Sequence, residues 1–304
     1  MHLGGLDLNL LVVLDALLTE KNVTRAGERV YLSQSATSAA LARLRQFFGD
    51  ELLVPAGNRM MLTAQAMDMQ DQVRDIILRA DAITTNKAVF APATATGHFR
   101  LMMSDYPATV LMPSALARIR TAAPGLTFQI LPLPRAPSEH LDRGEVDLLV
   151  MPQQWTSARH PSEDLFEDHY VCVVWAGSKL ISRRFTVDQY LDAGHIGVRF
   201  PGQPFPVLEE WFFEQLGRKR RVEVVTDNFT LAAHLVVGTD RVATMHSWLA
   251  RECAKVLPVR IVKTPIELPR VTECMQWHQY REPDPGIRWL RQMLKAAVPR
   301  RNRA

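Results

Sequence analysis

Side chains that could bind a nucleic acid are concentrated between Ser33 and Gly49. A helix turns about 100° per residue, so five small or polar side chains of this segment fall on one side of a helix, and the segment contains no acid. Glutamine can form two hydrogen bonds with adenine, serine can reach a base or a phosphate, and arginine can reach guanine or the backbone. The five positions are Gln34, Ser35, Ser38, Ala42 and Arg45. This face predicts a recognition helix that enters the major groove of double-stranded DNA.

The opposite side of this helix is apolar and needs packing partners. Residues Leu10–Leu18 repeat leucine at the spacing of an amphipathic helix, which Asp7 can cap, and a shorter helix is expected over about Thr24–Val30. Ser33 can cap the third helix, and Gly49 can end it in a left-handed conformation. The apolar side comprises Thr37, Ala40, Leu41, Leu44 and Phe48. Backbone phosphates are expected beside Thr24, Arg25 and Arg29.

A polar turn after the third helix lies between two short apolar runs. Glu51–Val54 and Met60–Leu62 flank the Pro-Ala-Gly-Asn-Arg segment 55–59, an arrangement typical of a β-hairpin. Such a hairpin would be a wing that carries Arg59 towards the minor groove or a phosphate. A three-helix packing element with a merely polar exterior is the alternative, and the added wing favours DNA binding over it.

The charge balance alone says little about a partner. The 304-residue chain has 36 Lys and Arg against 32 Asp and Glu, a net charge of +4. Residues 1–62 contain six bases and six acids, so this region is neutral and its bases matter only through their positions. Two further basic clusters, residues 218–221 and the acid-free stretch 288–303, are expected to be solvated loops or tails.

The composition is that of a globular chain without a membrane span or a catalytic signature. With 47% hydrophobic and 22% charged residues it is not disordered, and the apolar run Leu8–Leu18 is interrupted by Asp15 and too short to span a bilayer. No basic segment precedes that run, so no signal peptide is expected, and three widely separated cysteines fit a reducing cytoplasm. The chain has no P-loop, dinucleotide-binding, nucleophile-elbow or H-E-x-x-H motif, so no enzyme activity, cofactor or metal site is expected.

The first sixty residues resemble the winged helix-turn-helix of LysR-type transcriptional regulators. The resemblance is carried by Leu6–Leu11, Asn22–Ala26 and Leu32–Arg45, and the A-L-A-R-L-R ending is similar to the branch that contains the regulators NodD and NahR. It implies that four of the outer side chains face bases and that others lie near the DNA backbone. The base-facing set is Gln34, Ser35, Ser38 and Arg45, and the backbone set is Thr24, Arg25, Ser33 and Arg43.

Three positions depart from that family pattern. Ser35 stands where proline is usual, Gly27 where a second alanine is usual, and Val54–Pro55 where arginine is frequent. A glycine inside a helix costs about 1 kcal/mol relative to alanine, so the second helix is expected to have low stability. The Val54–Pro55 departure weakens the expected contact between the wing and a phosphate.

Residues 64–85 contain neither proline nor glycine and predict one long helix. Apolar residues recur along it by steps of three and four, as in a coiled-coil seam. The seam comprises Ala66, Met69, Val73, Ile76, Ala80 and Ile83. An amphipathic helix packed on its own domain is the alternative. In the resembled family this position holds a linker helix that pairs two subunits, so residues 1–62 would be the DNA-binding domain and residues 63–90 the dimerisation helix and hinge.

From Phe99 onwards strands alternate with helices, which predicts an α/β fold with a mainly parallel sheet and a ligand site beyond the C-terminal strand ends. Strands are expected near residues 99–103, 126–133, 146–151, 170–175, 195–199, 222–226, 241–244 and 260–262, and helices near 109–122, 138–143, 207–216, 230–237, 246–254 and 286–297. Arg143–Leu149, Asp240–Thr244 and Trp277–Arg291 extend the family resemblance. It implies a type 2 periplasmic-binding-protein-like effector domain over 91–304, with one lobe at about 91–162 and 267–304 and a second lobe at about 163–266.

Residues at these strand ends could line a cleft between the lobes. Their mixture of apolar, aromatic and a few hydroxyl, amide and imidazole groups predicts a small aromatic effector, an acid or a phenol. Taken singly, Met275 and Trp277 fit a core better than a ligand contact, and His246 better fits a hydrogen-bonded interior position. Asp105 could cap the helix or accept a hydrogen bond from a phenolic hydroxyl. The candidates are Ser104, Asp105, Tyr106, Thr109, Met151, Pro152, Phe200, Asn228, Phe229, Thr230, His246, Trp248, Met275 and Trp277.

These observations predict a cytoplasmic LysR-type regulator that binds a dyad-symmetric DNA operator as a homodimer or a homotetramer. Its expected partners are double-stranded DNA, a small-molecule effector and RNA polymerase, with no membrane and no cofactor. An enzyme or a solute-binding protein on the same two-lobed domain is the alternative, since a fold does not fix a function. Neither alternative needs a winged helix-turn-helix, so the first 62 residues favour the regulator.

Overall fold

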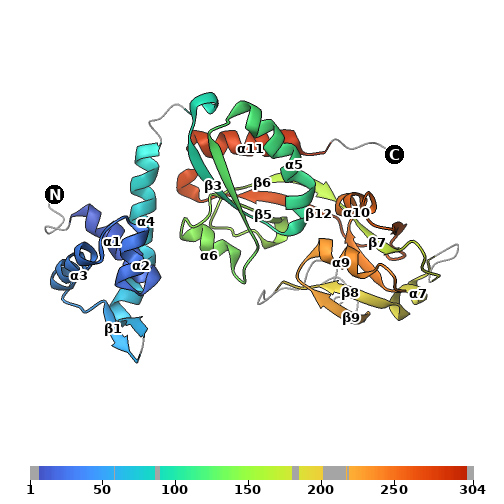
Figure 1. The fold of residues 1–304 in the computed structure, drawn as a ribbon, viewed down its shortest axis with the longest axis horizontal. Helices are drawn as coiled ribbons and strands as arrows, with labels where there is room; N and C mark the ends of the chain where they lie inside the picture. Colours follow the sequence, from blue (N-terminus) through green and yellow to red (C-terminus); the bar gives the residue numbers. More distant parts are fainter. Residues whose placement is uncertain are drawn as a thin grey trace. The chain divides into compact units, whose positions relative to one another are not determined.

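The computed structural model describes residues 7–57, 59–85, 90–179, 185–200, 217 and 219–299. The chain divides into two compact units, Met1–Ala88 and Val89–Ala304 (Figure 1). The helix expected over residues 207–216 and parts of both basic clusters lie outside the described residues. No helix in the described ranges is both long and apolar enough to cross a membrane.

The first unit is a three-helix element followed by a hairpin and a long helix. Leucines of the first helix pack against the inner side of the third, where Thr37 and Leu44 are fully buried and Phe48 is half-buried. Asp7, Asn22 and Ser33 cap the three helices through their side chains, and Gly49 ends the third with a φ of 63°. The elements are α1 (Leu8–Glu20), α2 (Val23–Arg29), α3 (Gln34–Phe48), β1 (Leu53–Ala56), β2 (Arg59–Leu62) and α4 (Ala64–Thr85). The predicted helices and hairpin are thus confirmed.

Gly27 lies where α2 approaches the turn before α3. A Cβ atom there would lie 2.7 Å from Thr37 Oγ1 and 2.8 Å from the carbonyl oxygen of Leu32. The backbone amide of Leu32 also donates to the carbonyl oxygen of Gly27 at 2.8 Å. The glycine at this position therefore permits a close approach of two backbone segments, which offsets its low helix propensity.

The predicted seam on α4 changes its surroundings halfway along the helix. Ala66 and Val73 are buried in the core that the first unit forms with α1, whereas Ile76 and Ile83 are 45% and 65% exposed, and Ala80 is exposed too. Asp15 and Arg74 fix the near half, because their side chains form an ion pair at 2.8 Å and are only about a tenth exposed. The first half of the seam is therefore an intramolecular contact, which corrects the expectation of a continuous pairing surface.

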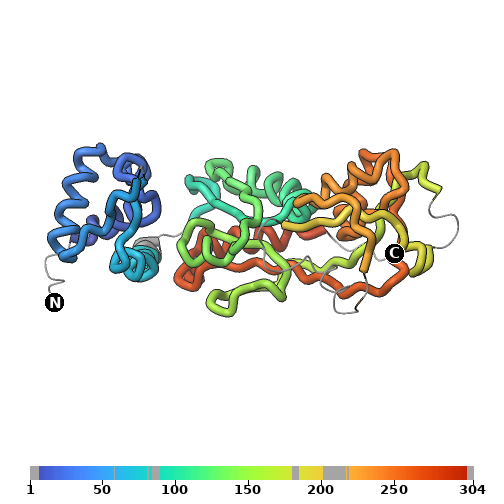
Figure 2. The backbone as a smooth tube through the Cα atoms, turned by 90° about the horizontal axis from the view of Figure 1, so that it is seen from below, coloured from blue at the N-terminus to red at the C-terminus, as the bar shows by residue number. Residues whose placement is uncertain are grey.

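The second unit contains two mixed sheets. In the first lobe the strand order is β4-β3-β5-β12-β6, and β12 pairs antiparallel with both β5 and β6 while β3 pairs parallel with β4 and β5. Near the end of the chain, β12 and α11 return to lie beside the first-lobe elements (Figures 1 and 2). The elements are β3 (Gly97–Met102), α5 (Asp105–Ala122), β4 (Leu126–Leu131), α6 (Pro137–Asp142), β5 (Leu148–Pro152), β6 (Ser162–Asp168), β12 (Val271–Gln276) and α11 (Pro285–Ala297), with 3-10 turns η1 (Pro92–Thr94), η2 (Gln153–Trp155) and η3 (Gln279–Arg281).

The second lobe has the strand order β11-β7-β10-β8-β9. Here β8 pairs parallel with β9 and β10, and β7 pairs antiparallel with β10 and β11. The expectation of mainly parallel sheets is therefore wrong. The elements are β7 (Tyr170–Trp175), α7 (Val187–Asp192), β8 (Gly194–Val198), β9 (Arg221–Thr226), α9 (Phe229–Leu235), β10 (Val242–His246), α10 (Ser247–Ala254) and β11 (Val259–Lys263).

The lobes exchange the chain at two crossings. One lies between β6 and β7 at His169, and the other lies between β11 and β12, over residues 264–270. Because β6 pairs with β12, the first lobe extends to Asp168 rather than to about residue 162. The sequence pattern missed β6, whose alternation of acids with Leu165 and Phe166 reads as a surface segment.

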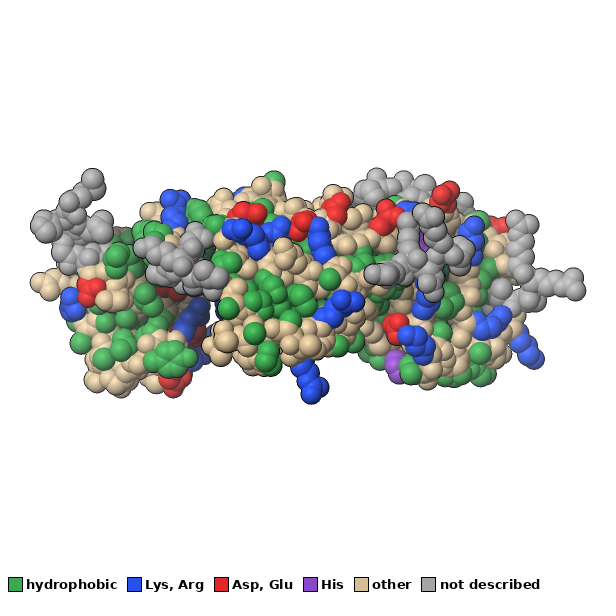
Figure 3. Space-filling view, turned by 90° about the horizontal axis from the view of Figure 1, so that it is seen from above, with side chains coloured by type: hydrophobic (Ala, Val, Ile, Leu, Met, Phe, Trp, Pro, Cys, Tyr) green, Lys and Arg blue, Asp and Glu red, His purple; other side chains and the backbone are tan. Residues whose placement is uncertain are grey.

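Several arginines of the two basic clusters bond to the protein surface rather than pointing freely into solvent. Arg221 pairs with Glu223 and donates to the carbonyl oxygen of Asp192, while Arg220 donates to the Tyr190 hydroxyl at 3.2 Å. In the C-terminal helix, Arg291 pairs with Glu163 at 2.8 Å. Basic and acidic side chains are correspondingly interspersed on the face of the second unit seen in Figure 3.

Candidate nucleic-acid surface and interlobe cleft

The outward face of α3 is exposed as the helical spacing predicts. Gln34, Ser35, Ser38 and Ala42 are all exposed, and so is Arg43 beside them. The Ser33 hydroxyl lies 3.0 Å from that of Ser35 and accepts from the backbone amide of Ala36 at 3.2 Å. Ser33 therefore starts the helix, and the next two turns present a small polar surface to solvent.

Arg45 has a different environment from the rest of this face. Its Nε donates to the carbonyl oxygen of Glu51 and a terminal nitrogen donates to that of Leu53, both at 2.9 Å. The guanidinium also pairs with the Glu51 carboxylate at 3.1 Å. These bonds hold the start of the wing to α3, so Arg45 is a wing-positioning residue rather than a free base-reading group. The expectation for Arg45 is corrected accordingly.

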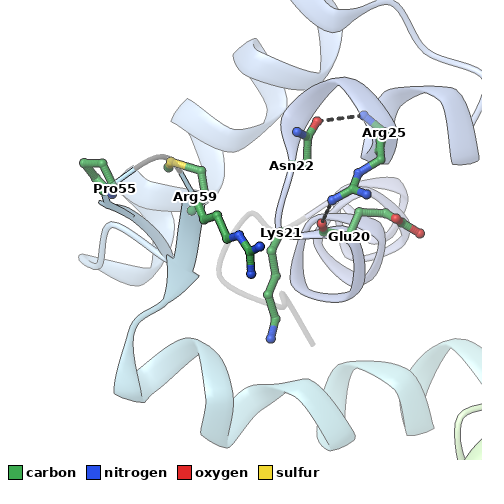
Figure 4. Close-up of a pocket in the computed structure, with 8 residues that line it drawn as sticks. Glu20, Lys21, Asn22, Arg25, Pro55 and Arg59 are labelled. Atoms are coloured by element: carbon green, nitrogen blue, oxygen red, sulfur yellow. Dashed lines mark hydrogen bonds between the residues drawn. The ribbon is translucent and has the colours of Figure 1, made fainter.

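A basic hollow lies between the wing and the turn that joins α1 to α2. Lys21, Arg25 and Arg59 line it, and the Lys21 and Arg59 side chains extend into the same space (Figure 4). Arg25 donates to the backbone oxygen of Glu20 at 3.2 Å, while the Glu20 carboxylate pairs with Arg29 at 3.1 Å. In the described part of the chain no acid pairs with Lys21 or Arg59. Their charges are therefore available to an anion, and Lys21 was missed as a site residue because it directly follows an acid at a helix end.

An aromatic cleft lies between the two lobes of the second unit. The space open to a water-sized molecule there is about 20 Å³, so its walls lie close together in this arrangement of the lobes. Six of the predicted effector residues line it, namely Ser104, Met151, Pro152, Phe200, Phe229 and His246. Four further residues that sequence reasoning missed complete the lining, namely Leu133, Trp155, Tyr170 and Glu273. An adjoining hollow is lined by Asp105 and Asn228, together with Ser104 and Phe200.

Two aspartates connect the lobes beside the cleft. Asp105, at the start of α5, accepts from the backbone amides of Phe229 and Thr230 at 3.1 and 2.7 Å, and from the Thr230 hydroxyl. Asp168, at the end of β6, is 2% exposed and accepts from Tyr106 and from α10. Its donors on α10 are the Ser247 hydroxyl and the Trp248 amide. Asp105 therefore contacts the start of α9 in the other lobe, whereas the sequence pattern predicts that it lines the effector site or caps a helix.

The polar groups of the cleft are uncharged near neutral pH. Burial lowers the pKa of His246 to about 3, and its Nδ1 has no hydrogen-bond partner among the described residues. Burial, with Asp168 nearby, raises the pKa of Glu273 to about 8, and its Oε2 likewise has no partner there. The Tyr106 ring stacks on His246 with centroids 3.8 Å apart and an interplanar angle of 2°. The cleft thus combines flat aromatic walls with two unsatisfied polar atoms.

The remaining predicted effector residues do not line these two cavities. Met275 and Trp277 are 0% and 2% exposed, and Arg291 stacks over the Trp277 ring at 3.4 Å from its centroid. Trp248 stacks on Phe166 with centroids 4.8 Å apart. Tyr106, Thr109 and Thr230 belong to the helices that meet at the lobe boundary. Core packing and interlobe contacts account for these positions better than a ligand does.

Glu273 is the functional candidate that sequence reasoning most clearly missed. It lies on β12 in register with Pro152, which brings it to the cleft. A signal was present, because an acid stands in the middle of the otherwise largely apolar strand Val-Thr-Glu-Cys-Met-Gln. A charged residue in a central strand needs either a partner or a function.

Both units match known families. Residues 8–67 match the bacterial regulatory helix-turn-helix proteins of the lysR family, and residues 92–299 match the LysR substrate binding domain. The chain belongs to the LysR family. It is 41% identical to nodulation protein D 2 of Rhizobium tropici over 97% of this chain and 93% of that protein. It is also 41% identical to nodulation protein D of Bradyrhizobium sp. (strain ANU 289), over 97% of this chain and 87% of that protein.

Solved structures of LysR-type proteins share the fold. A full-length OxyR variant from Pseudomonas aeruginosa superposes with a TM-score of 0.76 at 16% identity, over 98% of this chain and 96% of that one. The regulatory domain of MexT, a transcriptional activator in P. aeruginosa, gives a TM-score of 0.59 at 26% identity, over 68% of this chain and 100% of that one. This LysR-type transcriptional regulator therefore has a helix-turn-helix unit and an effector-binding unit. Its family consists of regulators, so the alternatives of an enzyme or a solute-binding protein are set aside.

Proposed function

We propose that this LysR-type regulator reads a dyad-symmetric DNA operator through α3 and responds to a small aromatic effector held in the interlobe cleft. The DNA-reading part of the proposal rests on the exposed, acid-free face of α3. Beside it lies a hollow whose basic side chains Lys21 and Arg59 pair with no acid in the described chain. Gln34, Ser35 and Ser38 contact base edges, whereas Arg43 and Ser33 lie by the backbone. Thr24, Arg25, Arg29, Lys21 and Arg59 supply further phosphate contacts.

Two copies of α3 are needed to match a dyad-symmetric site. The exposed part of α4, with Ile76, Ala80 and Ile83, is the proposed contact between subunits, and pairs of dimers form the tetramer. Full-length CbnR, whose structure was solved in complex with its target DNA, shares this fold at 16% identity and a TM-score of 0.52. Acting on the chromosome, the regulator works in the cytoplasm and alters the activity of RNA polymerase at the bound promoter.

The effector half rests on the cleft between the lobes. Its walls belong to both lobes, so a bound molecule favours one arrangement of the lobes over others. A flat aromatic molecule suits walls formed by Trp155, Tyr170, Phe200 and Phe229. The proposed effector can be either an aromatic acid or a phenol.

The test of DNA reading replaces Gln34 with alanine. DNA sites are first selected from a random-sequence library by the wild-type protein, and fluorescence anisotropy then compares selected with random DNA. Loss of a two-bonded base contact lowers the ratio of specific to non-specific affinity by at least about tenfold. Gln279→Ala, an exposed glutamine in the effector-binding unit, is the matched control and leaves the ratio unchanged. An unchanged ratio for Gln34→Ala contradicts the assignment of α3.

A further inference from the structure

Glu273 lies where no described donor or counter-ion stabilises an ionised carboxylate. The residue is 2% exposed, and its Oε2 has no hydrogen-bond partner among the described residues. No ion pair in the described ranges involves it, and the described lining of the cleft includes neither Lys nor Arg. An isolated buried carboxylate is strongly disfavoured, so the side chain holds its proton. A protonated carboxyl group can donate one hydrogen bond into the cavity it lines.

The surroundings of this carboxyl group reinforce the neutral form. Asp168, on the neighbouring strand, raises the pKa of Glu273 by its negative charge, in addition to the larger effect of burial. Across the cavity, His246 is uncharged, and its Nδ1 has no partner in the described structure. The cleft, as far as it is described, therefore has two buried polar atoms without partners and also the hydroxyls of Ser104 and Tyr170, but no positive charge, between aromatic walls. A negatively charged ligand would lose its hydration there without a counter-ion, and the nearby charge of Asp168 would add to that cost.

We propose that Glu273 sets the charge selectivity of the cleft, admitting uncharged aromatic effectors that accept a hydrogen bond from its carboxyl group and rejecting aromatic carboxylates. This inference rests on the proposed effector function of the cleft and narrows it. Selectivity of this kind comes from the cost imposed on the wrong ligand as much as from the bond offered to the right one. Glu273 is thus a specificity-determining residue of the effector site.

The pH dependence of binding follows from the groups that face Glu273. They are Asp168 on β6, Tyr106 on α5, Cys274 on β12 itself and, across the cavity, Tyr170 on β7 and His246 on β10. Burial raises the pKa of Tyr106 above its ordinary value and that of Cys274 to about 12, and lowers that of His246 to about 3. These three groups keep one protonation state between pH 7 and 9, a range in which Glu273 loses its proton.

The experiment compares two flat probes of nearly equal shape, 2-acetylnaphthalene and 2-naphthoate, by calorimetry on the full-length protein. At pH 7 the ketone binds at least about tenfold more tightly than the carboxylate, because only the carboxylate brings an uncompensated charge. Ketone affinity then falls by about tenfold between pH 7 and 9, because the protonated fraction of an acid with a pKa of about 8 falls by that factor. Neither probe changes its charge in this range.

Three variants separate the possible causes. Glu273→Gln keeps the shape and a donor, so it retains ketone binding and loses the pH dependence, whereas the matched control Glu252→Gln, whose side chain on α10 is 43% exposed, behaves as the wild type. Trp155→Ala weakens ketone binding and shows that the probe occupies the cleft. Equal affinity for the two probes, or a pH dependence that persists in Glu273→Gln, overturns the selectivity proposal alone. Failure of both probes to bind overturns the aromatic-effector function itself, and the selectivity proposal with it.

Discussion

The outward face of α3 and the interlobe cleft differ in the exposure and hydrogen bonding of their polar side chains. On α3, Gln34 and Ser38 are exposed, and water satisfies them until a partner replaces it. In the cleft, His246 and Glu273 are 3% and 2% exposed, and each has an atom that nothing in the described structure satisfies. The exposed surface suits a large, hydrated and charged polymer, whereas the cleft suits a small ligand that supplies missing hydrogen bonds away from water.

The largest expected effect comes from replacing Asp168, whose carboxylate accepts the buried hydrogen bonds beside the cleft. Asp168→Ala leaves the Tyr106 hydroxyl, the Ser247 hydroxyl and the Trp248 amide without their acceptor. We expect the free energy of unfolding of the effector-binding unit to fall by about 4 kcal/mol, since each buried donor left without an acceptor costs about 1–3 kcal/mol. Because all six tryptophans lie beyond residue 150, urea unfolding followed by tryptophan fluorescence reports this unit selectively.

The matched control for this substitution is Asp164→Ala, an exposed position on the same strand. It is expected to shift the unfolding midpoint only slightly, because solvent replaces most of what the side chain contacts. Equal shifts for the two variants would show that Asp168 is not the main connection between the lobes.

A second prediction concerns the pH dependence of stability. The folded chain keeps a proton on Glu273 that the unfolded chain loses between about pH 4.5 and 8, so stability falls as pH rises through that window. Burial also lowers the pKa of His246 to about 3 and that of His195 to about 4, so stability falls as pH drops below about 6.5. We expect a maximum near pH 6.5 and a loss of about 1 kcal/mol by pH 8.

Urea unfolding at a series of pH values measures this curve. In Glu273→Gln the alkaline loss disappears while the acid-side loss remains, because the histidines are untouched. A wild-type curve that stays flat from pH 6.5 to 8 would mean that Glu273 is ionised in the folded protein, and the contrast between a dry cleft and a wet helix face would not hold.

The most local expected effect lies on the DNA side. Arg45→Ala removes the bonds to the carbonyl oxygens of Glu51 and Leu53, so the wing loosens by about 1 kcal/mol. Faster hydrogen exchange at the backbone amides of residues 53–62 measures this change. Arg43→Ala, an exposed neighbour on α3, leaves the exchange unchanged. If both variants exchange alike, Arg45 does not position the wing.

The same two regions differ in how far the sequence alone predicts them. The caps by Asp7 and Ser33 and the buried side of α3 depend on neighbours within a few residues, and the helical spacing predicts them. Arg45 was misplaced because its acceptors lie beyond the end of its helix. Glu273 was missed because the order β5-β12-β6 brings it beside Pro152, more than a hundred residues away in the chain. Strand order depends on long-range packing, which no local pattern encodes.

The divided seam of α4 has a mechanical consequence. Its near half is held to α1 by Ala66, Val73 and the buried pair of Arg74 with Asp15, and α1 in turn packs on α3. The recognition helix and α4 are therefore connected through α1. A rotation of α4 is passed through α1 to the reading surface of α3.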